Sequence, residues 1–214
     1  MSDSISLGFA LTDQDARAER RDAAANRQLL LETAARLFAS QGVASVHMAD
    51  IAKEAGVGKG TLYRRFAHKG ELCLHLLDKQ LQIFQDGVLF QLRHMTAEGR
   101  PYMAQLDHFL DMLVPFVANN LPLMIEVANS PMPVDGMGQD VNRPHFWQEM
   151  TVRGLLQRAQ QAAEISPLLD VNYIASALMA PLDARILYYQ LEGQEFPVER
   201  IGAGLRQLVG SLAN

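Results

Sequence analysis

Hydrogen-bond donors gather in one short stretch of the sequence, residues 51–66, which reads IAKEAGVGKGTLYRRF. From position 59 onward its polar side chains are amine, hydroxyl, phenol and guanidinium groups, with no carboxylate. Such donors bind phosphate oxygens and the acceptor atoms on base edges, whereas a carboxylate would be repelled by phosphate. The residues that we expect to face a duplex are Lys59, Gly60, Thr61, Tyr63 and Arg64. The chemistry of this stretch is that of DNA binding.

Two short helices joined by a tight turn would present these donors. Ile51, Ala52 and Ala55 give the first helix an apolar stripe that docks into a small core. Gly56 permits the sharp turn because glycine adopts conformations that other residues avoid, and Val57 fills the angle between the helices. The second helix is left exposed, which is typical of a DNA-reading helix-turn-helix.

The charge distribution supports a DNA-facing N-terminal part. The whole chain has a net charge of −5, which by itself argues against a nucleic-acid partner. Residues 1–70, however, hold ten Lys and Arg against eight Asp and Glu, so that this part carries +2 and the remainder −7. A basic head on an acidic body would approach a polyanion head first.

Length and composition limit the class of protein. A chain of 214 residues with 49% hydrophobic residues can form one large or two modest domains with a substantial core. We expect no membrane span and no secretion signal, and therefore a cytoplasmic location. The single cysteine, Cys73, cannot form an internal disulfide or a cysteine-based zinc site.

Hydrophobic periodicity predicts an all-α fold without convincing strands. Residues 1–21 lack a helical period and have two open interpretations, a flexible solvated tail or an arm that contacts DNA. A helix from Ala23 would stop at Gly42. Pro115 is expected to kink or end the helix that contains it. The other predicted segments are helices over 48–55, 71–95, 102–119, 121–129, 144–164, 170–192 and 197–212, and a mobile loop over 130–143.

A family resemblance extends over residues 27–72. Its elements are AARLFASQG at the end of the first helix, then DIAKEAGVGKGTLYRRF, then HKGEL at the start of the fourth helix. This order and spacing resembles the N-terminal domain of the TetR family of transcriptional regulators. The resemblance implies a DNA-binding domain over 22–70 and an effector-binding and dimerisation domain over 71–214. It further implies a homodimer whose third helices enter the major groove of a double-stranded operator.

The resemblance also implies roles for single residues. Tyr63 and Lys69 match positions that donate to phosphate, and Thr61 and Gly60 match the helix face that approaches backbone and bases. Two positions depart from the family pattern, since His47 and Gly58 stand where hydroxyl caps are common. Gly58 costs only a few tenths of a kcal/mol as a cap.

Several cationic side chains are candidates for sequence recognition. Consecutive helical residues diverge by about 100°, so Arg64 and Arg65 cannot face the same base step. We assign Arg64 to a base edge, and Arg65 to the DNA backbone or the neighbouring core rim. Lys59 is a second base or phosphate candidate, while His47 either faces solvent, contacts phosphate or caps its helix.

The C-terminal helices are expected to pair with those of a second copy, as in the family, where they form a four-helix bundle. A two-fold dimer matches a palindromic operator. Small residues there permit close helix approach, although pairing within one monomer is the alternative. The predicted interface residues are Ala175, Leu178, Leu182, Ile186, Ile201, Leu205 and Leu208.

The middle helices are rich in methionine and aromatic residues, which could line an adaptable apolar pocket or belong to an ordinary core. The candidate pocket residues are Phe84, Phe109, Met112, Phe116, Met124, Phe146, Trp147 and Met150. We therefore predict a small hydrophobic or aromatic effector and, following the family norm, a repressor that this effector releases.

Other functions are weaker candidates. The chain lacks the sequence signals of serine hydrolases, zinc proteases and nucleotide-binding enzymes, so we predict no enzyme, no catalytic residue and no cofactor. His75, His94, His108 and His145 lack metal-ligand spacing, and we predict no metal site. A redox role for Cys73 is less favoured than burial on its helix. The main alternative is a helix-turn-helix regulator that is controlled by a protein partner or that has no effector.

Overall fold

The computed structural model describes residues 13–131 and 146–213, with side chains from Arg21 onward. Within these ranges the chain is helical, and the only β pairing is an isolated bridge between Ile165 and Ala213. The all-α prediction is confirmed. The predicted loop over 130–143 lies almost wholly outside the described residues.

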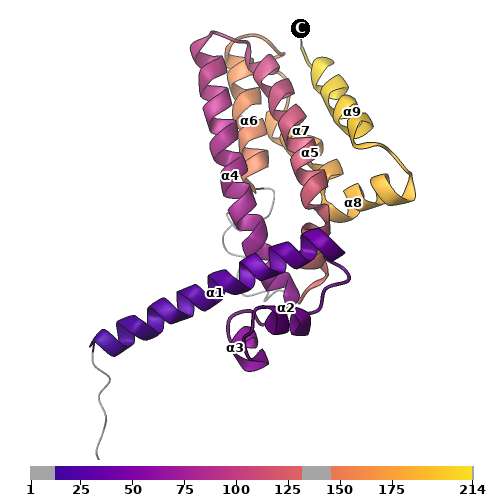
Figure 1. Ribbon diagram of the computed structural model, residues 1–214. Helices are drawn as coiled ribbons and strands as arrows, with labels where there is room; N and C mark the ends of the chain where they lie inside the picture. The colour runs from indigo at the N-terminus through magenta and orange to yellow at the C-terminus, as the bar shows by residue number, and fades with distance from the viewer. Residues whose placement is uncertain (1–12, 132–145, 214) are drawn as a thin grey trace, which may run out of the picture. The chain divides into compact units, whose positions relative to one another are not determined.

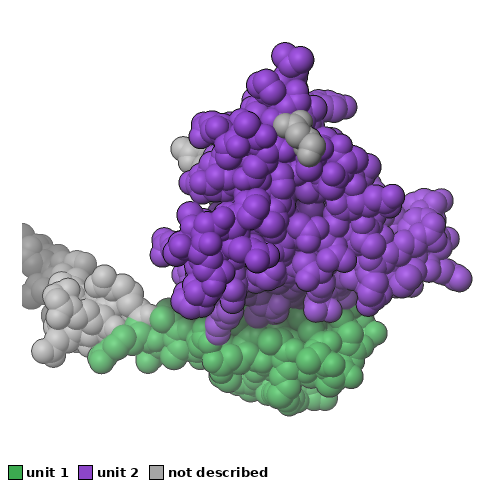
Figure 2. Space-filling view, turned by 90° about the horizontal axis from the view of Figure 1, so that it is seen from above, with its two compact units in different colours: residues 1–72 green, residues 73–214 purple. Residues whose placement is uncertain are grey.

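The chain divides into two compact units, Met1–Leu72 and Cys73–Asn214 (Figure 2). The first unit contains the helices α1, α2 and α3 and the first residues of α4, which continues into the second unit. Their bounds are Asp13–Gln41, Met48–Glu54, Lys59–Tyr63 and Lys69–Ala97 (Figure 1).

Helix α1 begins at Asp13, not at Ala23 as expected from the sequence. The extension consists largely of Ala, Arg, Glu and Asp, and most of these residues favour helix even where no apolar stripe marks one. Periodicity therefore missed it. The interpretations of residues 1–12 as tail or arm lie outside the described residues.

The first unit has a small apolar core that fixes the position of α3. Leu30 and Ala34 of α1 are fully buried, as are Ile51 of α2, Leu62 of α3 and Phe66 just after α3. A short helix such as α3 is not stable alone, so its place depends on this packing. Leu62 and Phe66, four positions apart, form its inward face.

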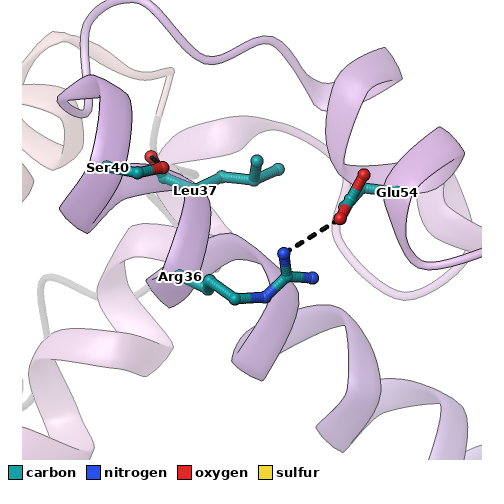
Figure 3. A network of polar contacts seen from close by, with 4 residues as sticks. All are labelled: Arg36, Leu37, Ser40 and Glu54. Atoms are coloured by element: carbon teal, nitrogen blue, oxygen red, sulfur yellow. Dashed lines mark hydrogen bonds and ion pairs between the residues drawn. The ribbon is translucent and has the colours of Figure 1, made fainter.

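An ion pair joins α1 to α2 at the surface of the same unit. The guanidinium of Arg36 lies 2.9 Å from the Glu54 carboxylate (Figure 3). Nearby, the Ser40 hydroxyl donates to the carbonyl of Leu37 at 3.1 Å. Both charged side chains are exposed, so the pair contributes at most about 1 kcal/mol, and the buried core carries most of the packing.

The second unit is built around α5, Tyr102–Asn129, which packs against α6, α8 and α9 (Figure 1). Leu106, Phe109, Leu110 and Leu113 of α5 are fully buried. The remaining elements are α6 Phe146–Gln161, α7 Val171–Met179, η2 Ala180–Leu182, α8 Ala184–Tyr188, η3 Tyr189–Gly193 and α9 Val198–Gly210.

Helix α5 continues through both of its prolines, Pro115 and Pro122. The prediction of two helices, over 102–119 and 121–129, was therefore wrong. Each proline removes one backbone donor and costs about 3 kcal/mol in a helix interior. Burial of Leu113, Val114 and Val117 on the same helix offsets that cost.

Residues 170–192 form several short elements where one helix was expected. Asp183 has an extended backbone, with φ −55° and ψ 139°, and its carboxylate accepts hydrogen bonds from the backbone N–H groups of Arg185 and Ile186 at 3.0 and 3.4 Å. Pro181 and this N-cap are the sequence signals for the break, and both were readable in the segment APLDA.

By length and composition alone, α5 could span a membrane, and it is the one such helix in the described part of the chain. The sequence reading had indicated none. Its apolar side is accounted for by packing within the second unit, because Leu106, Leu110 and Leu113 are all fully buried there.

Candidate DNA-binding head and ligand cavity

The turn between α2 and α3 depends on Gly56. Its φ of +67° lies in the left-handed region, where glycine pays no steric penalty. The backbone N–H of Gly56 donates to the carbonyl of Lys53 at 3.1 Å, and that of Val57 donates to the carbonyl of Ala52 at 3.0 Å. This pair of bonds closes the C-terminus of α2 and sends the chain directly into α3.

The outer face of α3 carries the predicted donors. Tyr63 is 51% exposed, while the neighbouring Leu62 is fully buried. The side chains of Lys59, Arg64 and Arg65 are exposed, as is Gly60, and Thr61 is half-buried. This exposure places Tyr63 outside the apolar core of the first unit.

Arg64 and Thr61 lie together on this face. The guanidinium of Arg64 donates to the Thr61 hydroxyl at 3.4 Å, a long hydrogen bond that a competing acceptor on DNA could replace. Arg64 is the C-cap of α3, so its side chain leaves the helix at its last turn. Arg65, one position further, is exposed as well.

The N-terminus of α2 is capped without a hydroxyl residue. His47 occupies the N-cap position, and its backbone N–H donates to the Asp50 carboxylate at 3.0 Å. In a capping box, the side chain of the third helical residue accepts a hydrogen bond from the backbone N–H of the N-cap residue, and Asp50 does this for His47. His47 itself is exposed, which leaves its imidazole accessible to phosphate or solvent.

A reciprocal cap also opens α4, and the sequence reading missed it. The His68 imidazole accepts from the Glu71 backbone N–H at 3.1 Å, and the Glu71 carboxylate accepts from the Ala67 backbone N–H at 2.6 Å. The segment HKGEL, noted only as a family signature, is thus a helix-start device. Lys69 follows His68 and lies with its amine 5.9 Å from the centre of the Phe38 ring.

The second unit contains an apolar cavity of about 190 Å³. Its wall comes from the N-terminal half of α4, the C-terminal half of α5, the start of α6 and the residues that open α8. The lining residues are Leu74, Leu77, Asp78, Leu81, Phe116, Val117, Asn120, Met124, Val127, Ala128, Gln148, Asp183 and Ala184.

Phe116 and Met124 are the predicted pocket residues that line this cavity. Phe84 does not line it but stacks on Phe116, with ring centres 4.1 Å apart and planes 12° from parallel. Trp147 meets Phe84 and Phe109 edge-on, at 6.3 and 5.9 Å. These aromatic side chains form a cluster that supports the Phe116 side of the wall.

The other predicted pocket residues lie elsewhere. Met112 and Phe146 are half-buried outside the lining, and Met150 is exposed and borders a different hollow. The candidate pocket residues from the sequence did not include the α4 side of the wall, to which Leu77 and Leu81 belong.

Most of the predicted interface residues are buried within their own chain. Ala175, Leu178, Leu182, Ile201 and Leu205 all belong to the core of the second unit, so they are not available to a partner in this conformation. Ile186 and Leu208, by contrast, are 46% and 58% exposed. The small size and helical spacing of these residues identified positions that pack closely. They did not show whether the packing is within the chain or against a second copy.

The titratable side chains do not assemble into a metal site within the described ranges. His75 and His94 each lie near one acidic residue of their own helix, Asp78 at 3.9 Å and Glu98 at 3.3 Å. His145 lies outside the described residues. Cys73 is fully buried, as the sequence reading favoured.

Comparison with known proteins places this geometry in a family. Residues 30–76 match the bacterial regulatory proteins of the tetR family. HTH-type transcriptional regulators from Staphylococcus aureus strains are 27% identical over 182 residues, which cover 84% of this chain and 90% of theirs. This chain is a TetR family transcriptional regulator. The sequence-based recognition and the helix-turn-helix assignment are confirmed.

Solved structures share the fold of this TetR family chain over most of its length. A transcriptional regulator from Saccharomonospora viridis, in complex with choline, has a TM-score of 0.67 at 19% identity, covering 89% of this chain and 98% of that one. Thermus thermophilus FadR, a repressor in complex with lauroyl-CoA, has a TM-score of 0.62 at 18% identity, covering 86% and 92%. At these identities the likeness concerns the fold.

Proposed function

We propose that this TetR family regulator is a cytoplasmic repressor that binds a palindromic operator as a homodimer and leaves it when a small, mainly hydrophobic ligand occupies the cavity. The observation that carries this proposal is the continuity of α4. The same uninterrupted helix begins with Lys69, the proposed phosphate donor, and supplies Leu77, Asp78 and Leu81 to the cavity wall.

In the proposed operator complex, the exposed face of α3 enters the major groove. Tyr63, Lys69 and His47 donate to phosphates, which fix the register of the head. Arg64 reads a base edge, Lys59 and Arg65 bind bases or backbone, and Thr61 and Gly60 let the helix approach closely.

A ligand acts through the difference in its affinity for the two states of the protein. A ligand between the α4 and α5 walls would favour one position of α4 and so change the placement of Lys69 relative to the operator. Couplings of this kind are typically 1 to 3 kcal/mol, which corresponds to a 5- to 150-fold change in operator affinity.

The proposed subunit interface consists of exposed apolar and aromatic side chains of the C-terminal helices. They are Tyr173 of α7, Ile186 and Tyr188 of α8, Tyr189 of η3 and Leu208 of α9. Large exposed apolar groups of this kind are typical of association surfaces. One head alone makes too few DNA contacts for specific affinity. A two-fold dimer doubles the number of these contacts.

The alternatives are control by a protein partner and regulation without an effector. The cavity favours a small-molecule ligand, because an apolar hollow with a few polar groups is the usual form of such a site. The solved neighbours bind ligands as different as choline and lauroyl-CoA, so the fold does not itself select the ligand.

An operator-binding assay tests the proposal. A duplex carrying the sequence upstream of the encoding gene should be retarded by the full-length protein in a gel shift, at a stoichiometry of two chains per site. A screen of small hydrophobic compounds should then reduce the shifted fraction. The proposal would be contradicted if the protein retarded no palindrome from that region. It would also be contradicted if a single chain bound the site as tightly as two chains.

A further inference from the structure

We propose that the cavity selects a small organic cation, an ammonium group on an apolar or aromatic body, and rejects acyl-CoA-type polyanions. This inference rests on the proposed function in one respect, namely that the same cavity is the effector site. It starts from the kinds of polar atoms that line the wall.

The body of the ligand site is apolar and of limited size. Leu77, Leu81, Val117 and Met124 form most of it, and Phe116 adds an aromatic ring. A cavity of 150 Å³ lined by such side chains is known to hold benzene, so about 190 Å³ accommodates a ring and a short substituent. A long acyl chain would not fit wholly inside that space.

One nearly buried polar residue of the lining, Asn120, carries an acceptor. Asn120 is only 4% exposed, and its amide nitrogen is already used, donating to the carbonyl of Phe116 at 2.9 Å. Among the described residues, its amide oxygen has no hydrogen-bond donor. An accessible amide oxygen without a donor, on a side chain that is otherwise nearly buried, can accept from a ligand that brings an N–H or can face an ammonium group.

Two carboxylates add negative charge at the rim. Asp78 of α4 and Asp183 at the start of α8 both line the cavity and are exposed, and the described lining contains no Lys, Arg or His. A phosphate group would therefore meet repulsion here, whereas an ammonium would be attracted. The remaining polar lining residue, Gln148, is a neutral amide.

Two basic side chains lie near the rim but outside the lining. The guanidinium of Arg185 donates to the carbonyl of the lining residue Ala128 at 3.2 Å, so this bond holds it at the end of α5. His75 lies 3.9 Å from Asp78 and would offset one carboxylate only when protonated. The ring of Phe116 adds a surface that attracts an organic cation.

Calorimetric titration of the full-length protein tests the charge preference with three probes. Benzyltrimethylammonium is the cation, neopentylbenzene is its neutral counterpart of the same shape, and lauroyl-CoA is the polyanion. We expect the cation to bind at least about tenfold more tightly than either of the others. Equal or tighter binding of the neutral compound or of lauroyl-CoA, or no binding of the cation, would overturn the proposal.

Variants locate the cation at the rim. Asp78→Asn and Asp183→Asn keep the size of each side chain, and asparagine still caps α8, so both proteins should fold. Each should weaken benzyltrimethylammonium roughly fivefold, and neither should change the affinity for neopentylbenzene. Asp86→Asn, on the exposed surface of the same helix and outside the lining, is the matched control and should leave all affinities unchanged. Unchanged cation affinity in both rim variants would refute the assignment.

The operator gel shift separates this inference from the proposed function. If the cation binds with the expected preference but does not release the operator, the ligand class stands and the effector role fails. If a neutral or anionic compound binds the cavity and releases the operator while the cation does not bind, the effector role stands and the ligand class fails.

Discussion

The carboxylate of Glu164 accepts a hydrogen bond from the backbone N–H of Tyr102 at 2.8 Å, across 62 positions of the chain. Its second oxygen accepts from the N–H of Met103, also at 2.8 Å. Pro101, at the N-cap of α5, has no side chain that could do this. The turn after α6 thus caps the central helix of the second unit, and the negative charge lies at the positive end of the helix dipole.

Glu164→Ala is expected to lower the free energy of unfolding of the protein by about 1 to 2 kcal/mol, because two backbone donors lose a charged acceptor. Chemical denaturation followed by circular dichroism measures this. Glu192→Ala, an exposed acidic residue of η3, is the control and should change stability by less than about 0.5 kcal/mol. An equal effect of both variants would show that the cap does not stabilise the unit.

The helix end beside Glu164 offers a stabilising change. Ala163 has a φ of +58°, in the left-handed region, and it ends α6 with the same bonding pattern that Gly56 gives to α2. Ala163→Gly should therefore raise the free energy of unfolding by roughly 0.5 to 1 kcal/mol. Ala162→Gly, one position earlier, should instead lower the free energy of unfolding. An increase in both variants would contradict the explanation that the left-handed backbone at Ala163 is strained.

Sequence reasoning predicted the head better than the body for a physical reason. The head is defined by local signals, such as Gly56 at a left-handed turn and the buried pair Leu62 and Phe66 four positions apart. In the body, Pro115 should have ended a helix, but tertiary burial of Val114 and Val117 outweighs its local cost.

Residue type likewise did not show which apolar residues face a cavity, a core or a partner. Phe116 and Phe109 lie on the same helix, yet the first lines the cavity and the second is fully buried. Leu205 and Leu208 of α9 show the same division between core and surface. Helical spacing gives the inward face, but the space left between neighbouring helices depends on the packing of the whole unit.

Filling the cavity should uncouple ligand response from DNA binding. Ala128 is an exposed lining residue at the end of α5, and Ala128→Phe would place a ring over the hollow without entering the core. We expect operator affinity to stay within about twofold, and benzyltrimethylammonium to bind at least tenfold more weakly. Ala97→Phe, exposed at the end of α4 and outside the lining, is the control. Undiminished ligand binding to Ala128→Phe would place the ligand elsewhere.

The proposed interface predicts a change of oligomeric state. A charge at Ile186 would have to be buried without a partner, so Ile186→Lys should weaken self-association by at least about 100-fold, equivalent to 2.7 kcal/mol. Sedimentation equilibrium measures the dimer constant. Ile83→Lys tests an apolar residue of α4 that is 66% exposed and should leave the constant unchanged. If only Ile83→Lys dissociated the protein, the interface would involve α4 instead.

Two substitutions in the first unit are expected to weaken DNA binding in different ways. Arg64 is exposed, and its guanidinium has only a long bond to Thr61, so Arg64→Ala should cost about 1 to 3 kcal/mol of operator affinity and relax preference at one base pair. Tyr63→Phe removes one phosphate donor and should weaken every sequence alike. Gel shifts against an operator and its single-base variants measure both effects. Lys53→Ala, an exposed cation of α2 outside the proposed contacts, should alter affinity far less. Intact affinity and base preference in Arg64→Ala would show that another side chain reads the operator.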